Sequence, residues 1–274
     1  MNDPSTSHDW VRRGRSTEAI ERFEAFFRGH GYTPHRHDTY AVGYTVSGVQ
    51  SFRYRRSQRH GLPGTVLVLH PDELHDGHAG TAEGFRYRMA YVSPWQMQQV
   101  LGGTVLPFIE GAVSRDPRLR ASIVALLARL DGGLDPLEEA DGLYDLARSL
   151  VAAAGHRLRK SAPDVAGVAR AREYMLDGLG RPKTLEQLAH ASGMDRWQLS
   201  RDFRAVLGTS PYRFLILRRL DQVRAHLLEG RTLASAALDA GFFDQSHMTR
   251  QFVAAYGVAP GRWLQRTGAT VWGD

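Results

Sequence analysis

The sequence predicts an α+β protein of two domains, in which a strand-rich N-terminal part precedes an all-helical C-terminal part. Apolar and polar residues alternate over short runs between positions 31 and 111, which is the pattern of strands with one solvated face. From residue 117 onward, apolar residues recur at helical spacing instead. A chain of 274 residues is long enough for two ordinary domains of roughly 100–200 residues each.

The predicted strands are short and are separated by turn residues. Tyr87, Met89 and Tyr91 alternate with Arg86 and Arg88, so one face of this segment is apolar and the other is charged. The run at 64–69 (Gly-Thr-Val-Leu-Val-Leu) is nearly all apolar, as in a strand buried on both sides. Glycine and proline punctuate these runs, and several short strands at this spacing predict a small sandwich or barrel.

Two helices are expected after the strands. A first apolar stripe ends at Gly132-Gly133, and a second begins after Pro136. Each stripe packs either on its own sheet or against a second copy, and the latter predicts a homodimer through the helices near 117–156. The polar stretch 157–164 contains a proline and marks the boundary between predicted domains 1–160 and 161–274. The stripes are Leu119, Ile123, Leu126, Leu127 and Leu130 in the first helix, and Leu143, Leu146, Leu150 and Val151 in the second.

Composition narrows the class of protein. Cysteine is absent, which excludes disulfides, thiolate zinc sites and cysteine nucleophiles. The net charge of +6 permits a polyanionic partner without requiring one. The N-terminal residues lack an apolar segment of signal-peptide length, and no apolar run approaches the roughly 18 residues of a membrane helix. We therefore expect a cytoplasmic protein that has no membrane partner.

An internal repeat between residues 184 and 263 is the most informative feature of the sequence. Each copy has an alanine followed four residues later by a glycine, then an apolar-x-Arg-x-Phe segment, and closes with Gly-x-x-Pro-x-Arg. Two copies in one order indicate a duplicated module rather than a solenoid, which needs about three or more repeats. The first copy uses Ala189, Gly193, Leu199, Arg201, Phe203, Gly208, Pro211 and Arg213, and the second uses Ala237, Gly241, Met248, Arg250, Phe252, Gly257, Pro260 and Arg262.

Each copy has the layout of a helix-turn-helix, at about residues 184–207 and 233–256. The alanine lets two helices approach closely, and the glycine can end the first helix in the left-handed conformation. The second helix buries its apolar residues at i, i+4 and i+8, so its N-terminal turns can enter a major groove of DNA. Between the units, Pro211 to about Leu228 forms one predicted helix of roughly 27 Å. This length is of the order of the 34–36 Å or so between major grooves on one face of DNA.

Residues 165–266 resemble the DNA-binding domain of the AraC/XylS family of bacterial transcription regulators. The resemblance rests on the segment 240–252 (Ala-Gly-Phe-Phe-Asp-Gln-Ser-His-Met-Thr-Arg-Gln-Phe) and on 256–263, with departures at Met248, Val253 and Trp263. It implies a regulator that binds promoter DNA and contacts RNA polymerase. It places Trp197, Ser200 and Arg201 of the first reading helix, and Gln245, Ser246, His247, Thr249 and Arg250 of the second, on the side that faces the DNA groove. Arg196 is better suited to a phosphate contact.

The strand region resembles the jelly-roll sensor domain of the same family, which is related to the metal-binding cupins. Segment 34–40 (Pro-His-Arg-His-Asp-Thr-Tyr), Gly48 and segment 64–75 carry this resemblance. It implies a small-molecule effector, and no resident metal or other cofactor is expected because position 41, where cupins carry a glutamate ligand, is alanine. We expect the effector pocket to be lined by His35, His37, Tyr40, His75 and Tyr91; if a metal were bound, His35, His37 and His75 would hold it.

Together these features predict a transcription regulator, rather than an enzyme, whose DNA binding responds to an effector in the N-terminal domain. One alternative is a cupin-type metal-dependent enzyme that uses the three histidines. Another is a constitutive DNA binder whose barrel serves only for assembly, with the histidines capping its rim. The sequence does not identify the effector or the operator, and it does not decide between activation and repression.

Overall fold

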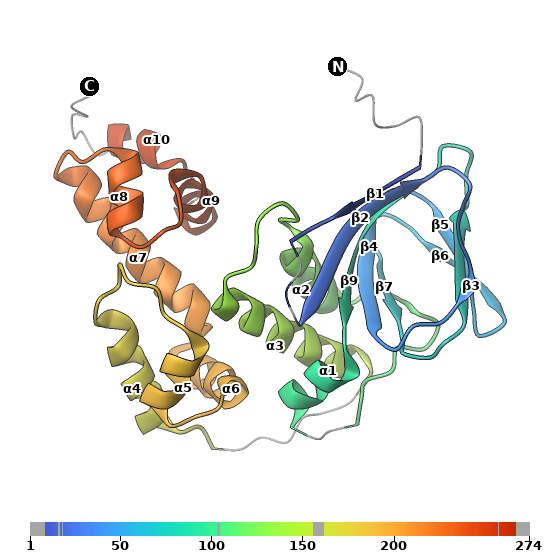
Figure 1. Ribbon diagram of the computed structural model, residues 1–274, viewed down its shortest axis with the longest axis horizontal. Helices are drawn as coiled ribbons and strands as arrows, with labels where there is room; N and C mark the ends of the chain where they lie inside the picture. Colours follow the sequence, from blue (N-terminus) through green and yellow to red (C-terminus); the bar gives the residue numbers. More distant parts are fainter. Residues whose placement is uncertain are drawn as a thin grey trace. The chain divides into compact units, whose positions relative to one another are not determined.

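The computed structural model describes residues 9–15, 17, 19–102, 105–155, 162–256 and 258–266. The chain divides into two compact units (Figure 1). The N-terminal unit comprises Met1–Asp135 and Gly142–Ser161, and the C-terminal unit comprises Pro136–Asp141 and Ala162–Asp274. Most of the predicted boundary stretch, at 157–161, and Gly257 of the second repeat lie outside the described residues.

The N-terminal unit is built on two antiparallel sheets (Figure 1). The first has the strand order β1-β2-β9-β4-β7-β10, and the second has the order β3-β8-β5-β6. The strands are β1 (Trp10–Arg13), β2 (Ile20–Phe27), β3 (His30–His35), β4 (Tyr40–Gly48), β5 (Gln50–Tyr54), β6 (Ser57–Gly61), β7 (Val66–Leu69), β8 (His75–Ala79), β9 (Phe85–Val92) and β10 (Val113–Ser114).

Apolar side chains from both sheets form the core of this unit, among them Phe27 of β2, Phe52 of β5 and Leu67 of β7. β7 is buried along its whole length, as its uninterrupted apolar run predicts. β9 buries Phe85, Tyr87 and Met89, while the arginines between them stay partly exposed. The predicted fold class is confirmed for this half of the chain.

Three helices accompany the sheets: α1 (Pro94–Leu101), α2 (Pro117–Leu127) and α3 (Pro136–Ala153). α2 begins where the sequence predicts, because Asp116 accepts a hydrogen bond from the main-chain N–H of Leu119 and Pro117 takes the first helical position. It contacts β4, β7 and β9, so its apolar stripe packs on its own sheet. The fully buried Arg22 donates hydrogen bonds to the carbonyls of Leu126 and Arg129, which satisfies main-chain acceptors near the end of α2.

The C-terminal unit is helical and contains both predicted helix-turn-helix units. The turn glycines have the left-handed conformation that the repeat requires, with φ of 71° at Gly193 and 84° at Gly241. None of the helices in the described part of the chain is long and apolar enough to cross a membrane. The helices are α4 (Val165–Leu176), α5 (Leu185–Ser192), α6 (Arg196–Leu207), α7 (Pro211–Leu228), α8 (Leu233–Asp239), α9 (Gln245–Tyr256) and α10 (Pro260–Arg266).

Helix α7 spans Pro211–Leu228, as predicted, and contributes to two separate cores. Its first half supplies Leu215 to the core of the first helix-turn-helix unit, where it meets Leu199 and Phe203 of α6. Its second half supplies residues such as Leu220 to the core of the second unit. One continuous helix therefore connects the core beneath α6 with the core beneath α9.

Candidate effector pocket and DNA-reading helices

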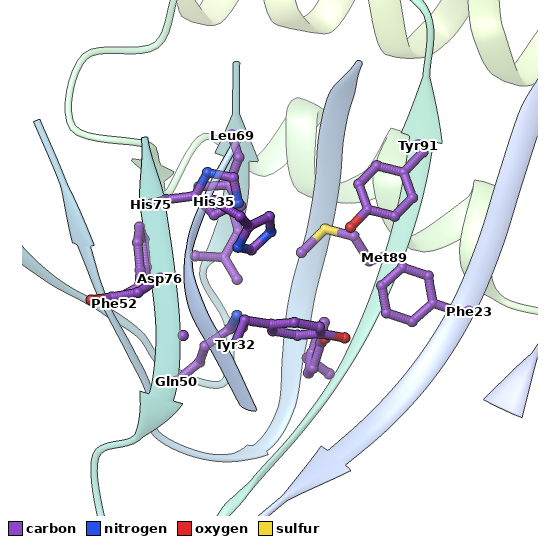
Figure 2. Close-up of a pocket in the computed structure, with 13 residues that line it drawn as sticks. Phe23, Tyr32, His35, Gln50, Phe52, Leu69, His75, Asp76, Met89 and Tyr91 are labelled. Carbon is purple, nitrogen blue, oxygen red and sulfur yellow. The ribbon is translucent and has the colours of Figure 1, made fainter. Parts of the chain in front are cut away.

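A small cavity lies between the two sheets of the N-terminal unit (Figure 2). Its volume is about 20 Å³, which is room for about one water molecule. An effector of ordinary size therefore has to displace side chains, and the unbranched thioether of Met89 is suited to such repacking. The lining residues are Phe23, Tyr32, His35, Gln50, Phe52, Leu67, Leu69, His75, Asp76, Gly77, Tyr87, Met89 and Tyr91.

Three histidines from the sequence prediction lie next to one another, and two of them, His35 and His75, line this cavity. The ring centroids of His35 and His75 are 4.5 Å apart, and those of His37 and His75 are 4.8 Å apart. Figure 2 shows His35 and His75 side by side among the lining residues. His37 is not among the lining residues, and its ring centroid lies 5.3 Å from that of Tyr91. Of the five residues predicted for the pocket, His35, His75 and Tyr91 line the cavity, and His37 lies next to them.

Main-chain carbonyls fix the tautomer of these histidines. Nδ1 of His35 lies 2.8 Å from the carbonyl of Thr33, and Nδ1 of His75 lies 2.9 Å from that of Glu73. Nδ1 of His37 makes the same kind of bond to a carbonyl, at 2.8 Å. A carbonyl only accepts, so each Nδ1 carries the hydrogen and each neutral ring keeps its lone pair on Nε2.

Burial keeps two of these rings neutral. It lowers the pKa of His75 to about 4, and it also lowers the pKa of His37 below the usual value. Both rings therefore act as neutral hydrogen-bond acceptors at physiological pH.

The fifth predicted residue, Tyr40, lies elsewhere. Its hydroxyl donates a hydrogen bond to the carbonyl of Pro107 at 2.9 Å, and its ring packs edge-on against His70. Nε2 of His70 in turn accepts a hydrogen bond from the main-chain N–H of Ile109 at 2.9 Å. Tyr40 and His70 therefore hold the segment 107–109 against the barrel, and Tyr40 is not among the residues that line the cavity.

The metal alternative receives no support from the arrangement of the described residues. Within them, no group of three or more histidine, cysteine or carboxylate side chains is placed to hold a metal ion. Ala41, at the position of the cupin glutamate, is 1% exposed on β4 and supplies no ligand atom.

Several lining residues were not predicted from the sequence. Tyr87 and Met89 share the alternating apolar face of β9 with Tyr91, so this pattern could have identified them. Tyr32, whose hydroxyl accepts a hydrogen bond from that of Tyr87 at 2.9 Å, lies in a strand without clear alternation. Nothing in the local sequence around Gln50 marks it as a pocket residue.

The second reading helix, α9, exposes the face that the sequence prediction assigns to DNA. Met248 and Phe252 are buried beneath it, while Gln245, Ser246 and Arg250 are exposed. Thr249 and His247 are partly exposed, and the His247 ring packs edge-on against Phe242. Asp244 accepts a hydrogen bond from the main-chain N–H of His247, which fixes the N-terminus of the helix.

The first reading helix, α6, is more covered. Ser200 is 1% exposed, and its hydroxyl donates a hydrogen bond to Asp141 at 3.0 Å. Asp141 also accepts hydrogen bonds from Arg204 at 3.2 Å and from the main-chain N–H of Tyr212 at 2.9 Å. This carboxylate belongs to Pro136–Asp141, which counts with the C-terminal unit. A DNA contact by Ser200 stays a prediction, and it requires the bond to Asp141 to open.

The other predicted residues of α6 are held by neighbouring side chains. Trp197 is 8% exposed, with the Arg196 guanidinium 4.4 Å above its ring. Nε of Arg201 donates a hydrogen bond to the buried carboxylate of Asp202 at 2.8 Å. Asp202 accepts a second one from the main-chain N–H of Asp164. A base contact by Arg201 stays a prediction, and Asp202 competes with DNA for its Nε.

Comparisons with known proteins match two separate segments of the chain. Residues 19–147 match the family of AraC-like ligand binding domains, and residues 188–266 match a family of helix-turn-helix domains. The HTH-type transcriptional regulator YbfI of Bacillus subtilis is 24% identical over 220 residues, which cover 78% of this chain and 80% of that protein. The RCS-specific HTH-type transcriptional activator RclR of Escherichia coli is 31% identical over 96 residues, or 34% of each chain. A structure of ToxT from Vibrio cholerae has 10% identity and a TM-score of 0.39, with 90% of this chain and 98% of that chain covered.

Proposed function

We propose that this chain, which belongs to the AraC family of transcriptional regulators, binds promoter DNA through both helix-turn-helix units under the control of a small molecule held in the N-terminal pocket. The observation that carries the proposal is the exposed polar face of α9, which lies opposite a buried apolar stripe. A helix of this kind is the element that enters a major groove. Helix α7 packs in the core beneath α9 and also in the core beneath α6.

On α9, the exposed side chains match base edges. Arg250 can donate two hydrogen bonds to a guanine, and Gln245 can pair with an adenine. Ser246, His247 and Thr249 complete this face as contacts to bases or to the DNA backbone. The buried Met248 and Phe252 hold the helix in position for these contacts.

On α6, the proposed contacts are Arg201 to a guanine and Trp197 to a thymine methyl group. Arg196 is suited to a phosphate, which positions the protein without reading sequence. Ser200 joins this set once Asp141 releases its hydroxyl. The two helices together would read a bipartite site with half-sites about one helical turn apart.

Effector control requires that the ligand bind one state of the protein more tightly than another. The N-terminal unit supports such control because its cavity carries polar groups among apolar walls. Linkage then demands reciprocity, so DNA must change the affinity for effector by the same factor. A catalytic role receives no comparable support, since the matched relatives are regulators of transcription.

Further partners follow from the same proposal. A groove between α2 and α3 of the N-terminal unit is lined by small residues with Arg118, Asp145 and Arg148 at its margins. A second copy could pack there, because small residues allow close approach and the opposite charges can pair across a two-fold axis.

RNA polymerase is the expected partner at a promoter, and the bacterial cytoplasm, which holds the chromosome, is the expected location.

Selection of binding sites tests this function. The full chain is incubated with duplex DNA of random sequence, and the retained molecules are sequenced over several rounds. We expect a bipartite motif whose halves are about one helical turn apart. The proposal fails if the retained DNA shows no enriched motif, or if the affinity for the best sequence equals that for random duplex.

A further inference from the structure

The pocket is rich in hydrogen-bond acceptors. His35 and His75 line it as tautomers whose lone pair is on Nε2, and His37 presents the same tautomer next to them. Nε2 of His37 and Oε1 of Gln50 are buried without a hydrogen-bond partner in the described part of the protein. A buried acceptor without a donor is unfavourable, so a ligand that supplies O–H or N–H groups gains affinity there.

The same pocket disfavours anions. The described residues that line it include no lysine or arginine. Its one carboxylate, Asp76, accepts a hydrogen bond from the main-chain N–H of Arg53 at 2.6 Å. A ligand carboxylate or phosphate would lose its hydration beside this carboxylate and several lone pairs, with no cation to compensate.

Aromatic rings form much of the remaining wall. Phe23 and Tyr91 stack with centroids 5.6 Å apart, and Tyr87 meets Phe23 edge-on at 5.8 Å. Phe52, Leu67 and Leu69 add further apolar surface. Flat rings pack well against such walls, both by area and by stacking geometry.

From these three observations we propose that the effector is an aromatic molecule that carries O–H or N–H donors and no anionic group. The ring lies against the aromatic walls, and the donors pair with Nε2 of His35 and His75 and with the Gln50 amide oxygen, all on residues that line the cavity. This inference rests on the proposed function and specifies the chemical class that the pocket takes.

Four probes separate the classes when they are titrated into the full chain in the presence of a chelator. Catechol carries two O–H donors, and tyramine carries a phenol and an ammonium group. Veratrole has the ring of catechol with both oxygens methylated, and benzoate carries an anion. We expect catechol or tyramine to raise the melting temperature by mass action, with veratrole and benzoate at least tenfold weaker in Kd.

Variants locate the binding. His75→Phe removes one acceptor and keeps a flat ring, and it should weaken the better donor probe at least tenfold. Gln50→Leu removes another acceptor without changing a histidine. It replaces His75→Phe as the test of binding if that variant does not fold. His60→Phe is the matched control, because His60 bonds to Ser51 and does not line the cavity, so binding should stay unchanged.

Three results with the organic probes would overturn the inference. They are binding of benzoate as tight as that of catechol, no binding by either donor-bearing probe at millimolar concentration, and binding that survives both His75→Phe and Gln50→Leu. In a separate titration, zinc alone is added without chelator. Tight zinc binding at these histidines would also overturn the inference. A donor probe that binds without changing DNA affinity leaves the ligand class standing and refutes effector control. An anion that binds and changes the affinity for DNA refutes the ligand class and leaves effector control standing.

Discussion

The two helix-turn-helix units share one sequence pattern, yet their reading helices stand in different surroundings. On α9, the residues proposed to read DNA are exposed or partly exposed. On α6, Trp197 and Ser200 are buried, and Arg201 is held by a carboxylate. Among the described residues, the core of the second unit is formed by residues from α7 onward, whereas the core of the first unit includes Leu137 from the segment Pro136–Asp141. The repeat therefore sets the fold of both units, while a segment outside it sets the access to α6.

The largest expected effect comes from Asp141→Ala. The substitution removes the buried carboxylate that accepts hydrogen bonds from Arg204, Ser200 and the Tyr212 N–H, so we expect a loss of about 3–5 kcal/mol in the stability of the first unit. Hydrogen exchange of the full chain should speed up in α6 while α9 stays protected.

Asp221→Ala is the matched control, because Asp221 is a half-exposed carboxylate that accepts a hydrogen bond from Tyr256 in the second unit. It should cost less than about 1 kcal/mol. Equal exchange rates in α6 of the wild type and of Asp141→Ala would contradict the assigned role of the carboxylate.

The two turn glycines should also differ. A Cβ at Gly241 would lie 2.8 Å from the main-chain oxygen of Gly180, whereas a Cβ at Gly193 would lie 3.4 Å from the flexible end of Arg170. Alanine at either position has to adopt the left-handed backbone conformation, which costs about 1–2 kcal/mol of stability. Gly241→Ala adds a steric clash of about 1–3 kcal/mol, and thermal unfolding of both variants compares them. Equal melting temperatures would show that the second turn can relax.

The arginines at matching repeat positions test the difference in DNA binding. Arg250→Ala should cost about 1–3 kcal/mol in affinity for the selected duplex and relax one base position. Arg201→Ala should cost less, about 1 kcal/mol or below, because wild-type Arg201 gives up its bond to Asp202 when it binds DNA. Anisotropy titrations on duplexes changed at single base pairs measure both. Arg250→Ala binding with wild-type affinity and specificity would refute the base-reading role of α9.

The smallest effect is expected from Val253→Arg. Val253 is 43% exposed on α9. An arginine there can reach a phosphate, so the dependence of log K on log salt should steepen by roughly one unit. A salt slope identical to that of the wild type would place position 253 away from the DNA backbone.

Local patterns predicted most of the fold. Period-two alternation identified β9, the uninterrupted apolar run identified β7, and the change to helical spacing from residue 117 onward indicated α2. In the C-terminal unit, the alanine–glycine spacing led to the left-handed turns at Gly193 and Gly241. These features were predictable because neighbours in sequence determine them.

The site was predicted less completely, since long-range contacts decide it. His35 and His75 were expected in the pocket, but Tyr40 turns to the carbonyl of Pro107, 67 residues away along the chain. Gln50 enters the pocket through the pairing of β5 with β8, which its own neighbours in sequence do not reveal. Burial of Ser200 likewise depends on Asp141, 59 residues earlier in the chain.

Coupling between pocket and DNA is the central claim, and an anisotropy titration of the selected duplex tests it most directly. The full chain is titrated without ligand and again at saturation with the probe that raises its melting temperature most. The account predicts that the Kd for DNA changes at least fivefold, and that the duplex changes the Kd for the probe by the same factor. An unchanged Kd for DNA with the pocket demonstrably filled would contradict effector control and leave a constitutive DNA binder.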